Sequence, residues 1–263
     1  MTFQRAFLLI LLAAALLAGC SGYGPPPSLK ALEERSASGD ATAYDGLVSY
    51  MAKEKRQDER SRAYIALLKA GQNAAPTILT AASEGDPTQR EHAIALAANL
   101  KLKGGFEVAM KALNDPSFPR RHSAAWALGE LGDARAIEPL ADTVESSDRE
   151  LTAREAARAL ARFGKAAVLP LAARLEKMPN KRKGYALRVL GELRDERGKP
   201  YLIKALEDPH TREDALWALG TMGRIGKPSD TAFYLDDQDW RVRVEAARAT
   251  GLLQENAAKA KRD

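Results

Sequence analysis

A block of small residues that recurs about every 30 positions is the feature that most constrains this chain. Its clearest copy runs from Ala124 to Gly132, with the sequence AAWALGELG. The equivalent positions 98, 129, 161, 191, 220 and 251 are separated by 31, 32, 30, 29 and 31 residues. A fixed period of this size is typical of solenoids, in which each unit buries its apolar face against its neighbours. Because helix-forming residues dominate and no strand-like alternation persists, we expect an all-α fold, an α-solenoid of helical hairpins.

The unit that begins at Asp115 illustrates the two helices expected in each repeat. Asp115 and Pro116 predict a helix start, and the first helix then runs to about Leu131, where Gly132 ends it. A second helix is expected from about Arg135, with Pro139 in its first turn. Helical spacing places a set of apolar residues inward: Ala124, Ala127, Leu128 and Leu131 on the first helix, and Ile137, Leu140, Ala141 and Val144 on the second. Asp86-Pro87 and Asp208-Pro209 are expected to open units in the same way.

A basic residue keeps a fixed place three positions before the alanine block in five units. These residues are Arg90, Arg121, Lys183, Arg212 and Arg243. We favour a structural ladder, in which each base meets an aspartate or the carbonyl groups at the end of a neighbouring helix. A ligand-binding stripe is the alternative.

The pattern resembles the HEAT-like repeats of the phycobilisome-lyase type. The resemblance rests on Asp-Pro-x-x-Arg, present at 86–90 and 208–212, on the alanine block, and on a second helix of the form Ile137-Glu138-Pro139-Leu140. It covers about residues 86–254, with a degenerate unit expected at 58–83. The family spans adaptors, scaffolds, chromophore lyases and a hydroxylase, so the resemblance implies the fold and leaves the activity open.

The first 28 residues are expected to lie outside the fold. Residues 1–19 resemble a bacterial lipoprotein signal peptide, because an apolar run of 12 residues, 7–18, is too short to span a membrane and ends before Cys20, the only cysteine. In that family the cysteine is lipidated, so we expect lipid attachment, including palmitate, at Cys20. Residues 20–28 predict a tether rich in Gly, Ser and Pro. Ser21 after the cysteine favours the outer membrane of the bacterial cell envelope, facing the periplasm.

The remaining chain divides into three predicted parts. They are an N-terminal helical cap at 29–57, the repeat solenoid at 58–254 and a basic tail at 255–263. The whole chain has 40 Lys and Arg against 35 Asp and Glu, a formal net charge of +5, with both signs interspersed. A nucleic-acid-binding surface would gather basic residues on one face, so we expect no nucleic acid partner. We expect another envelope protein, of unknown identity, and the membrane at Cys20.

Catalytic groupings are not evident in the sequence. His92, His122 and His210 are the only histidines, and none is followed by Glu as in the His-Glu pairs of the iron hydroxylase of this repeat class. We expect each of them to be an exposed helix residue. There is no Gly-x-Ser-x-Gly nucleophile motif and no glycine-rich phosphate loop. We therefore expect no catalytic residue, no cofactor, no metal, no small-molecule substrate, and a protein that is not an enzyme.

The third position of the alanine block is the best candidate for partner binding. It lies opposite the predicted core face, and its occupants include the candidates Trp126, Arg158, Arg188, Trp217 and Arg248. Exposed tryptophan is a common interface anchor, although a neighbouring loop could instead cover both Trp side chains. Trp240 is expected to be a packing residue. A second candidate surface is the row of second helices, with Asp142, Arg174 and Lys204 exposed.

These observations predict a non-catalytic, lipid-anchored adaptor or scaffold for protein–protein interaction in the cell envelope. One alternative is an enzyme or chromophore-handling, lyase-like protein on the same scaffold, which a bound metal or pigment would favour. The other alternative is a structural envelope component, which high copy number and self-association would favour.

Overall fold

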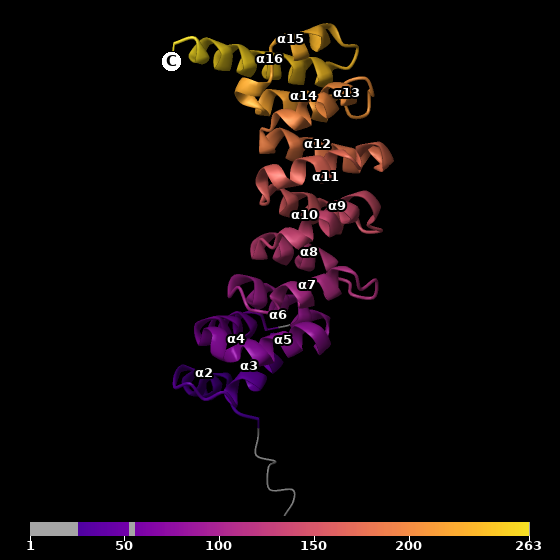
Figure 1. Cartoon of the computed structure of the whole chain (residues 1–263). Helices are drawn as coiled ribbons and strands as arrows, with labels where there is room; N and C mark the ends of the chain where they lie inside the picture. Colours follow the sequence, from indigo (N-terminus) through magenta and orange to yellow (C-terminus); the bar gives the residue numbers. More distant parts are fainter. Residues whose placement is uncertain (1–25, 53–55, 263) are drawn as a thin grey trace, which may run out of the picture.

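The computed structural model describes residues 26–52 and 56–262, and these form a single stack of helical pairs (Figure 1). No strand occurs within these ranges. The stack runs in chain order from α2 at one end to α16 at the other, so that each pair lies beside the next pair in the sequence. The predicted all-α solenoid is confirmed.

Each repeat consists of a longer A helix followed by a shorter B helix. The A helices are α4 (Gln57–Ala70), α6 (Pro87–Asn99), α8 (Arg121–Leu131), α10 (Glu150–Ala161), α12 (Asn180–Leu193), α14 (Arg212–Thr221) and α16 (Trp240–Ala260). The B helices are α5 (Ala75–Glu84), α7 (Gly105–Leu113), α9 (Ile137–Ser146), α11 (Val168–Ala172), α13 (Lys199–Ala205) and α15 (Ser229–Ala232). Short 3₁₀ turns precede or follow several B helices, among them η2 (Ala134–Ala136), η4 (Leu175–Lys177) and η7 (Phe233–Asp236).

Successive A helices from α8 onward meet through small residues. An added Cβ at Gly129 would lie 2.8 Å from the Ala159 Cβ of the next repeat, and one at Gly220 would lie 2.9 Å from the Ala249 Cα. The backbones are therefore too close for a larger residue on this seam. Leucines such as Leu128 and Leu160 are fully buried beside it and fill the remaining space.

The repeat around α8 shows where the local expectations hold and where they fail. Gly132 ends α8 in the left-handed conformation with φ 70°, and the predicted inward residues of α9, from Ile137 to Val144, are buried. The helix start predicted at Asp115 is wrong, since α8 begins at Arg121. The Asp115 carboxylate instead accepts hydrogen bonds from the backbone N–H and hydroxyl of Ser117, and Pro119 cannot donate a helical backbone hydrogen bond.

The other two Asp-Pro pairs differ from each other for similar reasons. Asp86 caps α6 directly: its carboxylate accepts from the backbone of Thr88 and Gln89, and the Gln89 side chain accepts from the Asp86 N–H. Asp208 instead accepts from the backbone N–H of His210 in a turn, and α14 begins only at Arg212. The expectation of a helix start thus holds at Asp86 and is wrong at Asp208.

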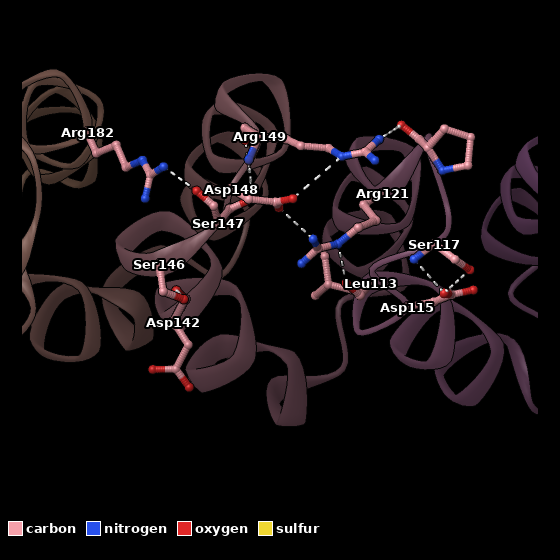
Figure 2. Close-up of polar contacts among 11 residues, drawn as sticks. Leu113, Asp115, Ser117, Arg121, Asp142, Ser146, Ser147, Asp148, Arg149 and Arg182 are labelled. Carbon is pink, nitrogen blue, oxygen red and sulfur yellow. Dashed lines mark hydrogen bonds and ion pairs between the residues drawn. The ribbon is translucent and has the colours of Figure 1, made fainter.

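Four of the five fixed basic residues, all of them arginines, form the expected ladder along the loops that join repeats, and Figure 2 shows the contacts of Arg121. Arg121 donates from Nε to the Leu113 carbonyl at 2.8 Å and from Nη1 to the Asp148 carboxylate at 2.8 Å. Arg90 contacts Asp115 at 2.9 Å and Arg212 contacts Asp237 at 2.8 Å, in each case the loop that follows the next B helix. Arg243 donates to the Asp237 and Gln238 carbonyls. Arg90, Arg121 and Arg212 therefore each connect their own repeat to the loop that opens the next one.

The two ends of the stack are built differently. At the start, α2 (Leu29–Ala37) and α3 (Ala43–Met51) lie in the predicted cap and bury Leu29, Leu32 and Tyr44. At the other end, residues 255–260 continue α16 and do not form a separate tail. The predicted signal peptide, Cys20 and tether residues 20–25 lie outside the described residues. No helix within the described ranges is long and apolar enough to cross a membrane.

Candidate functional site

The third position of the alanine block forms a column along the outer side of the A helices. Arg158 on α10, Arg188 on α12 and Arg248 on α16 are exposed, as this position predicts, while Trp217 on α14 is half-buried. Trp126 on α8 is also half-buried and packs against the core. The column therefore presents guanidinium groups to solvent and only part of each indole.

Trp217 lies between arginines of the two neighbouring repeats. The Arg188 guanidinium carbon is 5.2 Å from the centre of the Trp217 ring, and that of Arg248 is 6.0 Å from it. Such cation–π contacts hold both arginines against the ring. Trp240, predicted to be a packing residue, is 62% exposed, so that prediction is wrong: it is the first residue of α16, where no later repeat covers it.

A groove of about 590 Å³ crosses α10, α12 and the start of α14 at this column. Its charged lining comprises Arg154, Arg158, Lys181 and Arg188 against Glu192 and Asp214. Two further carboxylates lie beside this lining, since Glu155 pairs with Arg158 at 2.7 Å and Glu150 lies 3.8 Å from Lys181. A ligand that carries carboxylates would compete with these pairings for the guanidinium groups.

The centre of the groove is held by a contact between α12 and α14. Arg188 donates from Nε to the Asp214 carboxylate at 2.6 Å. The same carboxylate rests against Gly184, where any Cβ would clash with it. Gly184 thus lets Asp214 approach the α12 backbone, and Asp214 fixes the direction of Arg188. The planar guanidinium keeps further N–H groups with which it could bind a carboxylate in two places.

Tyr185 supplies the aromatic surface of this groove. Burial raises the pKa of the Tyr185 hydroxyl above its usual value, and the neighbouring Glu150 carboxylate adds to the rise. Tyr185 therefore stays protonated at neutral pH, with its hydroxyl donating to the Glu150 carboxylate. The groove can bind a planar anionic ligand through Tyr185, Arg158 and Arg188 together.

The second helices present another surface, on which the candidates are likewise paired, and Arg174, which was expected to be exposed, is only 17% exposed. Arg174 contacts Glu138 at 2.7 Å and Asp142 at 2.6 Å, and Lys204 pairs with Glu176. A hollow of about 330 Å³ nearby, between α12 and α13, is lined by Glu176, Glu207 and Asp208 as well as by Lys183 and Lys204. Its mixed charge gives no preference for an anion.

The three histidines do not share one environment. His210 is exposed as expected, whereas His92 and His122 are partly buried, which corrects the expectation for both. His92 packs edge-on against Tyr64 with ring centres 6.3 Å apart, and burial lowers its pKa. The Nε2 of His122 is 4.0 Å from Glu91. Within residues 26–52 and 56–262, no group of three or more His, Cys, Asp or Glu side chains is arranged to hold a metal ion.

Comparison with known families identifies the class of repeat. The HEAT repeat family model matches residues 75–161 and 106–180, and the model of the PBS lyase HEAT-like repeat matches residues 183–208. Together with the stacked helical pairs, these matches define an α-solenoid of HEAT-like repeats.

The chain is also similar in sequence to a curated protein of known activity. Phycocyanobilin lyase subunit alpha of Picosynechococcus sp. is 31% identical over 143 residues, which are 54% of this chain and 47% of that protein. The chain thus spans about half the length of the curated relative it matches. The expectation that the chain is not an enzyme is contradicted by this comparison, because the relative is a subunit of a lyase.

Solved structures with the same helical architecture are more distant. Human deoxyhypusine hydroxylase is 18% identical with a TM-score of 0.40, and covers 84% of this chain and 99% of its own. The complex of CpcE and CpcF of phycocyanin lyase from Nostoc sp. is 18% identical with a TM-score of 0.42, and covers 89% of this chain and 96% of its own. A designed armadillo repeat protein is 18% identical with a TM-score of 0.40, over 80% of this chain and 99% of its own. They share the fold alone.

The repeat pattern predicted the exposed arginines of the groove but not the residues that surround them. Tyr185, Gly184 and Asp214 lie one or two positions before the alanine block, where no residue type is kept in more than two of the six units. Gly184 was the available signal, because it is the only glycine among the equivalent positions of the six units. A glycine inside a helix costs stability and suggests a close approach.

Proposed function

We propose that this protein is a HEAT-repeat subunit of a lyase-like complex and binds a carboxylate-bearing chromophore in the groove over α10, α12 and α14. The similarity to a phycocyanobilin lyase subunit is the observation that carries the proposal. The two arginines that line the groove, Arg158 and Arg188, support it as well. This function replaces the non-catalytic role expected from the sequence.

The chemistry of a bilin suits the residues in the groove. A bilin is a flat, conjugated tetrapyrrole with two propionate groups. Arg158 and Arg188 can bind the propionates, and Tyr185 can lie against a pyrrole ring. Asp214 accepts a hydrogen bond from Arg188 and keeps that guanidinium pointing along the groove. The residues thus bind and orient the ligand for a reaction completed with a partner.

Titration with phycocyanobilin tests this proposal directly. We expect the purified full chain to change the visible absorption spectrum of the pigment saturably, because a groove fixes the conformation of a flexible tetrapyrrole. The variant R158A/R188A is expected to weaken binding at least about tenfold, since each charge-assisted bond contributes about 1.5–3 kcal/mol. R135A, which removes an exposed arginine outside the groove, is the matched control. A spectrum that does not change with wild-type protein would overturn the proposal.

A second candidate function is protein binding through the same column. The specific observation in its favour is the half-buried Trp217 held between Arg188 and Arg248, since Trp and Arg are the residues that most often dominate protein interfaces. Capture of envelope proteins by the full chain, compared with W217A and W126A, tests it. A binding partner lost with W217A supports an interface at the column, and a partner retained by both variants contradicts it.

We also propose that the chain is anchored to the bacterial outer membrane through lipid on Cys20, facing the periplasm. The sequence Leu17-Ala18-Gly19-Cys20 after an apolar run supports this. Mass spectrometry of the mature protein should detect acyl chains on Cys20, and C20S should leave the membrane fraction. A mature protein without fatty acid contradicts the anchor and leaves the groove proposal standing.

A further inference from the structure

The last helix of the stack has one face that nothing in the described chain covers. α16 packs on α14 through the buried side chains of Val242, Ala246, Ala249 and Leu253. The opposite face carries apolar or small residues at the spacing of a helix–helix seam: Trp240, Val244, Ala247, Gly251 and Ala258. Trp240 is 62% exposed and Val244 is 58% exposed. Figure 1 shows α16 at the end of the stack, running past α14 to the C-terminus.

The glycine on this face occupies a position that is closed in three other repeats. Its equivalents Gly129, Gly191 and Gly220 all touch an alanine of the following A helix, at 2.6 to 2.9 Å from an added Cβ. Around Gly251 there is no atom within 4 Å. α16 therefore presents the same small-residue surface that contacts the next A helix in these three repeats. In the described chain no helix packs against this surface of α16.

Exposed apolar side chains gather at the same end of the molecule. Of the nine large hydrophobic residues exposed in the described chain, four lie in η7 or in the first turns of α16: Phe233, Leu235, Trp240 and Val244. A solenoid normally ends in a polar capping surface, as α2 and α3 provide at the other end. At the α16 end of the described residues, by contrast, these apolar side chains lie together at the surface, as in an interface.

Both ends of α16 carry exposed charge. The loop before the helix exposes Asp236 and Asp239, next to Arg241 and Arg243 in the first turn, whereas the end of the helix exposes Lys259, Lys261 and Arg262. If two copies of α16 packed antiparallel, the basic end of each would meet the acidic loop of the other. The small residues Ala247 and Gly251 would lie near the centre, where backbones approach most closely. Arg248 would not oppose its equivalent, because it pairs with Glu245 and turns back toward Trp217.

We propose that this face binds a second copy of the chain, giving a two-fold dimer in which the two α16 helices pack antiparallel. The seam is continuous with the interfaces inside each stack, and it is self-complementary as a two-fold interface requires. Head-to-tail packing of α16 on the other end of a second copy is disfavoured, because α2 and α3 carry no alanine block to complete the seam. This proposal does not depend on the chromophore function.

Sedimentation of the full chain in detergent, over a range of concentrations, tests the dimer. Wild-type protein is expected to shift from monomer to dimer, and A247E to raise the dimer dissociation constant at least about tenfold, because it buries an unpaired carboxylate in the seam. A257E, the same change on an exposed position of α16 outside the seam, should leave it unchanged. A chain that stays monomeric at every concentration, or an A247E variant that dimerises like wild type, overturns the proposal.

A charge reversal tests the antiparallel arrangement separately. K259E should weaken the dimer, and D236K should weaken it as well, since each places like charges together. The double variant D236K/K259E should recover most of the lost affinity, because the reversed pair is complementary again. Single variants without effect, or a double variant weaker than either, would contradict this register.

Discussion

The A side and the B side of the stack hold successive repeats together by different means. On the A side, glycine and alanine bring helix backbones into contact, with no space left between them. On the B side, the links include ion pairs with exposed carboxylates, such as partly buried Arg174 with Glu138 and exposed Lys204 with Glu176. The contacts between A helices therefore set the distance between successive repeats, whereas the flexible ion pairs between B helices can form over a range of distances.

The ladder of arginines lies between these two extremes. Its side chains are mostly buried, as for Arg121 at 15% exposure, and they bond to backbone carbonyls as well as to aspartates. The comparison predicts that stability falls steeply for changes on the A-side seam, moderately for the ladder and slightly for the B side.

The largest effect is expected for A127E. Ala127 is fully buried on α8, so the new carboxylate would lie without a partner among apolar side chains. We expect a loss of about 3–5 kcal/mol in the free energy of unfolding, measured by urea denaturation followed by circular dichroism. A variant as stable as wild type would show that the seam tolerates a charge.

A glycine pair on the seam sharpens the comparison. In G191A the new Cβ would lie 2.6 Å from the Ala218 Cα, so α12 and α14 must move apart, and we expect a loss of about 1–3 kcal/mol. G251A has open space and should gain up to about 1 kcal/mol from helix propensity. Thermal unfolding of both variants should therefore shift in opposite directions. Equal shifts would mean that close approach does not limit this seam.

R121A tests the ladder. The substitution removes the donor to the Leu113 carbonyl and to Asp148, so we expect a loss of about 1–3 kcal/mol. K183A is the matched control, because Lys183 holds the same place in its repeat but lines a solvent-exposed hollow. Urea denaturation of the two variants should separate them clearly. Similar losses would indicate that the position matters only for packing.

R174M tests the B side, where the expected effect is smaller. Glu138 and Asp142 are each 63% exposed, so water replaces the lost pairing, and we expect a loss below about 1 kcal/mol. High salt should reduce the difference between variant and wild type further. A loss as large as that of R121A would show that the two sides contribute alike.

Acid should act on the loops of the ladder. Hydrogen bonds from Ser117, and then from Arg90, lower the pKa of Asp115 from 3.8 to about 2. The folded state therefore binds its proton less readily than the unfolded state, and the stabilisation from Asp115 is complete above about pH 4 and is lost as the pH falls to about 2. Urea denaturation between these values should give a shallower pH dependence for D115N than for wild type. An unchanged slope would rule out this linkage.

The repeat made most of the fold predictable, since the spacing of Ala124, Ala127 and Leu128 places the core face without any knowledge of tertiary contacts. The helix starts were less predictable. Asp86 and Asp115 both precede proline, but only the first caps a helix, because Pro119 and the buried Phe118 follow the second. Residues 116–120 form a turn and not the first turn of a helix, because the turn allows Phe118 to pack in the core.

The candidate groove depends on contacts between repeats that a periodic pattern does not contain. Arg158 and Arg188 were evident as exposed positions of a repeated block, whereas the Arg188–Asp214 contact links residues 26 positions apart on different helices. Trp240 was misjudged for a related reason, since its surroundings depend on whether another helix follows in space. Positions that face a neighbouring unit are therefore predictable inside the array and unpredictable at its margin.

The unit that begins at Asp115 carries both halves of the ladder's coupling, because Asp115 receives Arg90 from the unit behind and Arg121 reaches forward to Asp148. A duplicated unit would arrive with both halves and could join the row without any compensating change elsewhere. Gene duplication could thus lengthen such a protein one module at a time, and the departures from the rule, at Ala153 and Lys183, mark the junctions where a later insertion or loss would meet the least resistance.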